Sequence, residues 1–264
     1  MVGDAALRAY LARVTAAAGD APPAAVLGAV AGAVARVHGV ALDPGAGLLQ
    51  PTGEVDAPAF SPPEGVAAPE LLGQVYESLR STGARRSTGA FYTPEAVARP
   101  IVVAVLDGLP GQGEASRVLD GVPGCGEVPR VGDPSAGGGA FLLAAVRHLT
   151  ARGGDPRVLV RDCVFGVDVD PIAVAVTRTA LAIVAGGQPP PAAHVRVADA
   201  LDDPQPLPAG LDAVVGNPPF LSQLAAATAR SPAQRRALEA RFGAPARGYA
   251  DTAVLFLLLA MRLV

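Results

Sequence analysis

The feature that most constrains the fold is an alternation of short apolar runs and amphipathic segments between residues 131 and 215. The short runs are rich in β-branched residues, and the segments between them carry apolar side chains at helical spacing. In chain order the pieces are 131–132, 141–149, 164–167, 172–185, 194–197 and 211–215. Parallel strands joined by crossover helices give this alternation, so the sequence predicts an α/β fold with a Rossmann-like sheet.

The chain before residue 69 predicts a helical extension. Apolar residues recur at helical spacing over 4–18 and 23–37, and the Pro- and Gly-rich stretch 39–69 has no period, which is typical of a long connection. We expect 1–68 to form this extension with its linker and 69–264 to form the α/β domain. Within that domain Thr93, Pro94 and Glu95 predict a helix with Thr93 as N-cap. Ser231 and Gln234 have the spacing of a capping box, and a last helix is expected near Asp251.

Composition limits the partners and the compartment. The formal net charge is −3, whereas a protein that mainly holds a phosphate backbone usually shows a basic face, so autonomous tight DNA binding is not expected. Cys125 and Cys163 are too few for a disulfide scaffold or a zinc cluster, which predicts a cytoplasmic protein without a metal site. The apolar tail 253–260 is shorter than the roughly 20 residues that cross a bilayer, and no secretory signal pattern is seen, so no membrane association is expected.

A glycine-rich turn follows the first predicted strand. It reads Asp-Pro-Ser-Ala-Gly-Gly-Gly-Ala-Phe-Leu over residues 133–142. Small residues let a ligand approach the backbone, and an acid at a strand end can hold a cationic or hydroxyl-bearing group. Alone, the turn fits a dinucleotide site, a nucleoside site or a purely structural role, although its spacing departs from G-x-G-x-x-G and disfavours a dinucleotide.

Carboxylates follow the next two predicted strands. Asp168 lies where a carboxylate can accept two hydrogen bonds from ribose hydroxyls. Asp170, followed by Pro171, is adequately explained as a helix N-cap. Asp199 could accept from an adenine amine, although an isolated aspartate at a strand end is more often a turn residue.

Residues 217–220, Asn-Pro-Pro-Phe, give the most specific signal. They follow the strand 211–215, at the carboxyl edge where parallel sheets bind ligands. Two prolines set the backbone and remove amide donors, so their carbonyl oxygens can accept from a substrate N–H. The Asn217 side-chain oxygen can accept the second proton of the same amine, and Phe220 can stack on a flipped base. A Pro-Pro turn alone is common, but this combination after three cofactor-type strand ends is not.

Five segments stand in one order along the chain: Phe-Tyr-Thr-Pro at 91–94, the glycine-rich turn, Gly-Val-Asp-Val-Asp-Pro at 166–171, Ala-Asp-Ala-Leu at 198–201 and Asn-Pro-Pro-Phe. This order resembles the N6-adenine DNA methyltransferases, especially the methylase parts of type I and Eco57I-like restriction-modification enzymes. The segment 72–77 is also similar to the part of that family that leads into the domain. Methyltransferases that act on glutamine side chains or RNA bases share Asn-Pro-Pro-aromatic and stay as alternatives; Phe-Tyr-Thr-Pro favours DNA.

The resemblance implies S-adenosylmethionine as cofactor and a role for each motif. Tyr92 and Thr93 would hold the methionine part together with the glycine-rich turn, Asp168 the ribose, and Asp199 the adenine ring. The implied cofactor-binding set is Tyr92, Thr93, Asp133, Ser135, Ala136, Gly137, Gly139, Phe141, Asp168, Val169, Asp199 and Ala200. The implied catalytic set, which would hold an adenine flipped out of DNA, is Asn217, Pro218, Pro219 and Phe220.

The resemblance also implies parts that are not seen in this sequence. Methyltransferase sheets of this type have about seven strands, whereas four are predicted here, so the strand that ends near Val215 would be an unprotected edge. No segment resembles a target-recognition domain, and we expect a truncated chain or a segment that needs such a domain or subunit to choose its DNA. A noncatalytic remnant or subunit is the alternative of a different class.

Overall fold

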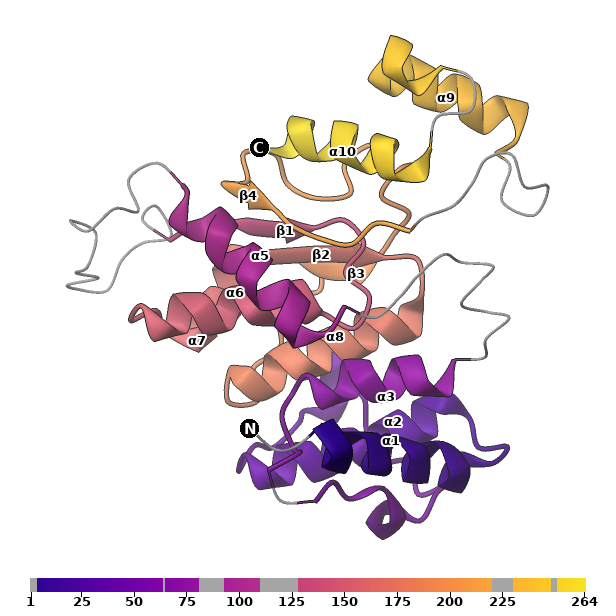
Figure 1. The fold of residues 1–264 in the computed structure, drawn as a ribbon, viewed down its shortest axis with the longest axis vertical. Helices are drawn as coiled ribbons and strands as arrows, with labels where there is room; N and C mark the ends of the chain where they lie inside the picture. Colours follow the sequence, from indigo (N-terminus) through magenta and orange to yellow (C-terminus); the bar gives the residue numbers. More distant parts are fainter. Residues whose placement is uncertain (1–3, 64, 81–92, 110–127, 220–229, 248–250) are drawn as a thin grey trace.

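A parallel sheet lies at the centre of the molecule (Figure 1). The computed structural model describes residues 4–63, 65–80, 93–109, 128–219, 230–247 and 251–264. Within these residues the strands are β1 (Val131–Asp133), β2 (Val164–Asp168), β3 (Val195–Val197) and β4 (Ala213–Val214). Their order is β3-β2-β1-β4, and every pair is parallel. The predicted α/β fold is therefore confirmed.

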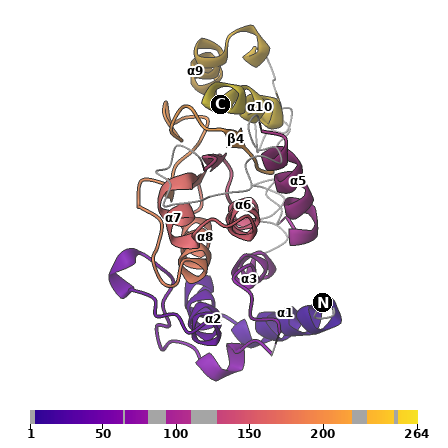
Figure 2. The same ribbon diagram turned by 90° about the vertical axis from the view of Figure 1, so that its left-hand side faces the viewer.

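Helices cover both faces of the sheet. On one face lie α6 (Ala140–Ala151) and α8 (Pro171–Val184), with α5 (Glu95–Asp107) packed against α6 (Figure 2). On the other face lies α10 (Thr252–Leu263), with α9 (Pro232–Phe242) beside it (Figure 1). The short α7 (Pro156–Val158) and a π-helical turn (Leu159–Cys163) lead into β2.

Strand β2 supplies side chains to two separate hydrophobic cores. Val164 belongs to the larger core, under α6 and α8, while Phe165 and Val167 belong to a smaller core with Leu255 and Leu259 of α10. Successive residues of a strand point to opposite faces. A strand that is apolar on both faces is consequently buried on both, as expected for a parallel sheet.

The N-terminal helices pack beneath the sheet domain (Figure 1). The predicted helices at 4–18 and 23–37 are confirmed as α1 (Asp4–Ala18) and α2 (Pro23–Val37), and both contact α3 (Leu71–Leu79). Among its described residues, the connection 39–69 contains only short 3-10 helices, at Pro44–Ala46 and Ala57–Phe60. Another 3-10 helix follows α9 at Ala244–Ala246. The larger core runs without a break from Val30 of α2 through Leu72 of α3 to Leu142 of α6.

Helix starts follow local chemistry with one correction. The capping box is present, since Gln234 N donates to Ser231 Oγ and Ser231 N donates to Gln234 Oε1, and Asp251 caps α10. Thr93, however, does not cap α5, because the helix begins at Glu95 with Pro94 in the N-cap position. The Thr93 hydroxyl instead accepts a hydrogen bond from a residue 124 positions away.

Strand β4 is the edge of the sheet among the described residues, as predicted, but its side chains are not exposed. Ala213 and Val215 are 3% and 6% exposed, and the backbone N–H of Leu211 donates to the carbonyl of Leu263 at the end of α10. Ala213 and Val215 are covered by the larger core, while Val214 packs against the smaller core that includes α10. The unprotected edge expected for this strand stays a prediction. None of the described helices is both long and apolar enough to cross a membrane.

Candidate active site

A pocket lies where the carboxyl ends of the strands meet. Most of the sequence-predicted site residues line it: Thr93, Ser135, Ala136, Gly137, Phe141, Asp168, Val169, Asp199, Ala200, Asn217 and Pro219. Asp133, Gly139 and Pro218 are described but do not line it, and Tyr92 and Phe220 lie outside the described residues. Residues from four different strand ends thus meet in one hollow, because parallel strands deliver their carboxyl ends to the same edge.

The glycine-rich turn needs its glycines for two different reasons. Gly137 and Gly139 have φ angles of +51° and +82°, which side-chain-bearing residues rarely adopt. Gly138 has no such angle, but a Cβ atom there would lie 2.6 Å from the Cα atom of Gly73 on α3. The turn is also held by the Thr177 hydroxyl, which donates to the Gly137 carbonyl at 2.7 Å. Gly138 therefore allows the close approach of α3 to the turn.

Asp168 is held in place by backbone donors. Its Oδ2 atom accepts from Gly137 N at 2.8 Å and its Oδ1 atom accepts from Asp170 N at 2.9 Å. Burial raises the pKa of this carboxyl, while the two backbone hydrogen bonds oppose the rise. Each oxygen keeps a further lone pair, so the side chain can still accept from ligand hydroxyls.

Asp170 has the capping role that its sequence context predicts. Its Oδ1 atom accepts from Ile172 N at 2.8 Å, which caps α8. Its Oδ2 atom accepts from the hydroxyl of Tyr76 at 2.6 Å. Burial and this hydrogen bond raise the pKa of Tyr76, so its hydroxyl stays protonated and donates. Helix α3 is thus fastened to the end of β2 directly beside the pocket.

Asp133 lies beneath the pocket and is 1% exposed. Its Oδ1 atom accepts from Ser135 N at 2.9 Å, while its Oδ2 atom is buried without a hydrogen-bond partner in the described structure. Burial raises the pKa of this carboxyl to about 7, against a lowering by the Ser135 backbone hydrogen bond. A Cβ atom at Gly216 would lie 2.6 Å from Asp133 Oδ1, so glycine there lets the carboxyl lie against the backbone next to Asn217. Direct contact of Asp133 with a cofactor stays a prediction.

Asn217 connects two motifs that are far apart in the sequence. Its Nδ2 atom donates to the Thr93 hydroxyl at 3.3 Å, and Thr93 is 9% exposed. This contact places the amide nitrogen toward Thr93 and leaves the Asn217 side-chain oxygen available as an acceptor. Pro218 and Pro219 follow without N–H donors, and Pro219 lines the pocket.

Several pocket residues were not predicted from the sequence. Tyr76, Glu77 and Arg80 reach the pocket from α3, and Phe256 reaches it from α10. Tyr76 and Phe256 fit their helices as ordinary apolar residues, so periodicity alone assigns them to a core. For the α3 residues the available signal was the family resemblance of the segment 72–77, which contains Tyr76 and Glu77.

The pocket is rich in carboxyl groups. Glu77, Asp168, Asp170 and Asp199 line it, with Arg80 as the cation among its described lining residues. Such a set suits a ligand that carries positive charge and hydroxyl groups. A dinucleotide would bring its pyrophosphate toward these carboxyl groups, so the dinucleotide alternative is disfavoured.

A second and wider cleft lies at the amino ends of the strands. Its volume is about 520 Å³, against about 150 Å³ for the carboxyl-end pocket, and its lining includes Arg130, His194 and Arg196. Arg130 donates to the carbonyl of Gly210, and Arg196 donates to Asp203 and to the carbonyls of Gln205 and Pro206. These arginines hold a loop in place. Ligands of parallel sheets bind at the carboxyl ends instead, so the smaller pocket is the candidate active site.

Comparison with known proteins identifies the family. A family model described as N-6 DNA Methylase matches residues 67–263. No protein with a curated description matches the chain. Among solved structures, a protein from Listeria monocytogenes assigned as a class I S-adenosylmethionine-dependent methyltransferase has 12% identity and a TM-score of 0.54, over 99% of this chain and 71% of that one.

Two restriction-modification proteins also match. The type IIL enzyme MmeI, solved in complex with DNA, has 19% identity and a TM-score of 0.52, over 77% of this chain and 32% of its own. A protein from Vibrio vulnificus assigned as a modification subunit of a type I restriction enzyme has 24% identity and a TM-score of 0.46, over 74% of this chain and 36% of its own. This chain thus spans about a third of the length of these two proteins. Because the family model covers most of its residues, the chain belongs to the N-6 DNA methylase family.

Proposed function

We propose that this chain binds S-adenosylmethionine and transfers its methyl group to the N6 amine of an adenine in DNA. The observation that carries the proposal is the meeting of Asp168, Asp199 and Asn217 in one pocket at the carboxyl ends of the sheet. The family membership supports the same reaction. A restriction-modification or phage-defence setting is part of the proposal.

The proposed cofactor contacts follow the pocket from one end to the other. The turn of Ser135, Ala136 and Gly137 faces the methionine part, with Thr93 beside it. Asp168, with Val169, accepts from the ribose hydroxyls, and Asp199 with Ala200 faces the adenine ring. The carboxyl groups of the pocket fit a ligand with a sulfonium and an ammonium group, since opposite charges attract strongly where water is partly excluded. When bound, S-adenosylmethionine supplies an electrophilic methyl group.

Asn217 and Pro218 act on the target amine. The lone pair of the adenine N6 amine is delocalised into the ring, which makes the amine a poor nucleophile. The Asn217 side-chain oxygen and the Pro218 carbonyl each accept one N–H hydrogen bond, which favours localisation of the lone pair on nitrogen. Catalysis then comes from positioning and from stabilisation of the charge that develops on the amine. The cysteines have no role in this chemistry.

Thr93 sets the orientation of the Asn217 amide. Its oxygen accepts from Asn217 Nδ2, and this directs the amide oxygen rather than the amide nitrogen toward the adenine amine. The hydroxyl proton of Thr93 remains free to donate to the cofactor. The Thr93 hydroxyl can therefore contact both the cofactor and the residue that binds the target base.

DNA binding is proposed to need more than this chain. The adenine must leave the duplex stack, which costs a few kcal/mol, and stacking on Phe220 is proposed to offset part of that cost. A target-recognition domain or subunit would supply sequence choice. We propose residues 1–68 as a helical extension and 69–264 as the catalytic domain. The shared core around Leu72 supports an extension that stabilises the domain.

Methyl transfer can be tested directly. Radiolabelled S-adenosylmethionine is offered with double-stranded DNA, RNA and a cell protein extract in parallel, and digestion of the DNA product to nucleosides identifies N6-methyl-2′-deoxyadenosine. Label in DNA alone supports the proposal. Label in RNA or on glutamine side chains would instead favour the corresponding alternatives. Cofactor binding without transfer to any of the three would favour a noncatalytic subunit.

A further inference from the structure

The loop that connects β3 to β4 lies at the edge of the pocket and is held by several side-chain hydrogen bonds. It begins with Asp199 and Ala200, both of which line the pocket. Asp199 Oδ1 accepts from Leu201 N at 2.9 Å, and the Asp199 carbonyl accepts from Asp203 N at 2.8 Å. These bonds fold the start of the loop onto Asp199 itself.

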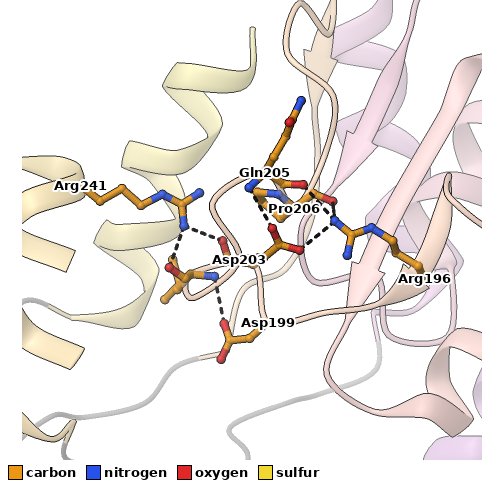
Figure 3. A network of polar contacts seen from close by, with 8 residues as sticks. Arg196, Asp199, Asp203, Gln205, Pro206 and Arg241 are labelled. Atoms are coloured by element: carbon orange, nitrogen blue, oxygen red, sulfur yellow. Dashed lines mark hydrogen bonds and ion pairs between the residues drawn. The ribbon is translucent and has the colours of Figure 1, made fainter. Parts of the chain in front are cut away.

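Arg241 of α9 reaches this loop from outside (Figure 3). One of its guanidinium nitrogens, Nη1, donates to the Leu201 carbonyl at 2.7 Å and to the Ala200 carbonyl at 3.2 Å. Leu201 is therefore held on both sides, since Asp199 accepts from its N–H and Arg241 donates to its carbonyl. A charged donor strengthens such bonds relative to a neutral one.

The opposite end of the loop has its own arginine. Arg196 of β3 donates through Nη2 to Asp203 Oδ2 at 2.8 Å and to the carbonyls of Gln205 and Pro206 at 2.9 and 3.1 Å (Figure 3). Arg196 is adjacent in sequence to the loop that it holds, whereas Arg241 lies 40 residues from Leu201. The contact from Arg241 ties the pocket end of the loop to α9, while the far end is tied to α10 by the bond from Leu211 N to the Leu263 carbonyl.

Apolar side chains of α9 pack against the start of the loop. Leu238 and Phe242 of α9 belong to the same buried core as Ala200 and Leu201. Burial and the nearby Arg262 lower the pKa of the Arg241 guanidinium, while the carboxylates of Asp203, Asp202 and Asp199 attract it and oppose this lowering. Apolar packing of α9 and attraction by the loop carboxylates therefore both favour an Arg241 side chain that faces the loop.

We propose that Arg241 is a positioning residue that holds Asp199 and Ala200 at the adenine end of the cofactor pocket. The inference rests on the proposed function, in which this end of the pocket binds the adenine of S-adenosylmethionine. Arg241 itself does not line the pocket. It acts through the peptide oxygens of Ala200 and Leu201, so its loss relaxes the adenine site and leaves the base-binding residues near Asn217 intact.

The test compares Arg241→Ala with Arg236→Ala, an exposed arginine on the same helix. Binding of S-adenosylmethionine and of adenosine, which lacks the methionine part, is measured by calorimetry on the full chain. Arg241→Ala is expected to raise both dissociation constants by the same factor, about tenfold, because two hydrogen bonds from a charged donor are lost. Arg236→Ala is expected to match wild type. Arg241→Gln keeps one donor and is expected to give about a threefold rise, which provides a milder variant if alanine impairs folding.

Two further readouts separate positioning from general stability. At saturating cofactor, Arg241→Ala is expected to keep kcat within about twofold of wild type, while KM for the cofactor rises. In the ligand-free protein, hydrogen exchange of the Leu201 and Asp203 amides is expected to accelerate in Arg241→Ala relative to Arg236→Ala.

Wild-type affinity of Arg241→Ala for both S-adenosylmethionine and adenosine would overturn the inference. Weaker binding of S-adenosylmethionine by this variant with unchanged binding of adenosine would also overturn it. Failure of the proposed function looks different, because wild type itself would then bind neither compound. In that case unchanged exchange of the two amides in Arg241→Ala would separately overturn the hold of Arg241 on the loop.

Discussion

The two ends of the sheet use polar side chains in opposite ways. At the amino ends, Arg130 and Arg196 donate to backbone carbonyls of neighbouring loops. At the carboxyl ends, Asp168 and Asn217 are held by other groups but keep acceptor atoms for a ligand. His194 at the amino ends is an exception, since its buried Nδ1 atom has no described partner.

The contrast shows why cavity size does not identify the active site. The amino-end cleft is the wider one, yet its cations are committed to holding the fold. A binding site needs side chains that are fixed in position and still have unused hydrogen-bonding capacity. Asp168 meets both conditions because backbone N–H groups occupy only part of its carboxylate.

Among the variants of the carboxyl-end pocket, Asn217→Ala should have the largest effect on methyl transfer. Loss of the acceptor for the adenine amine is expected to lower methyl transfer about a thousandfold, roughly 4 kcal/mol, while the dissociation constant for S-adenosylmethionine stays within a few-fold of wild type. Single-turnover transfer of labelled methyl groups to DNA measures this. Activity near the wild-type level would remove Asn217 from the proposed chemistry.

Asp168→Ala tests the cofactor end of the same pocket. Loss of two charge-assisted hydrogen bonds is expected to raise the dissociation constant for S-adenosylmethionine about a hundredfold, roughly 3 kcal/mol. Asp162→Ala is the matched control at the amino end, where Asp162 lines the other cleft and pairs with Arg161. Calorimetry should find no change for the control. Equal losses of affinity in both variants would mean that the carboxyl-end pocket is not the preferred site for S-adenosylmethionine.

Asp133→Asn probes a buried acid at the carboxyl end through the pH dependence of stability. The folded-state pKa of Asp133 is raised to about 7, so the folded protein holds this proton more tightly than the unfolded chain does. The protonated Asp133 side chain therefore contributes to the free energy of unfolding at acid pH, and this contribution is lost as pH rises toward 7. Between pH 5 and 7, wild type is expected to lose about 2 kcal/mol that the asparagine variant keeps.

Urea unfolding at pH 5 and pH 7, followed by circular dichroism, measures this difference. The side chain of asparagine keeps an acceptor for Ser135 N and has no proton to lose. Parallel changes of unfolding free energy with pH in the two proteins would mean that Asp133 is ionised throughout this range.

Thr93→Val should have the smallest effect. The isosteric methyl group cannot accept from Asn217 Nδ2, so the amide loses its preferred orientation, and kcat is expected to fall about tenfold, near 1.4 kcal/mol. Thr93→Ser keeps the hydroxyl and is expected to stay within about twofold of wild type. Steady-state kinetics at saturating cofactor separate this from weaker cofactor binding. A serine variant as slow as the valine variant would exclude the hydroxyl as the cause.

Local sequence determined much of the architecture of this protein. The spacing of apolar residues predicted the alternating strands and helices. Short-range hydrogen bonds from backbone N–H groups to their side chains explain why Asp170, Ser231 and Asp251 cap the starts of helices. Motif order predicted which strand ends meet at the pocket, because parallel connectivity leaves one edge where they can meet. These features depend on residues close together in the chain, and such interactions can be read from spacing.

Tertiary structure alone decided which polar atoms face the pocket. Asp133 is buried against Gly216, Thr93 accepts from Asn217 instead of capping α5, and Tyr76 of α3 lies beside the end of β2. Arg241 reaches the loop after β3 from α9, a helix that follows residues 217–220 in the chain. Each of these contacts joins residues at least 40 positions apart, and which partner a side chain finds at that range depends on how whole helices pack, which no local pattern specifies.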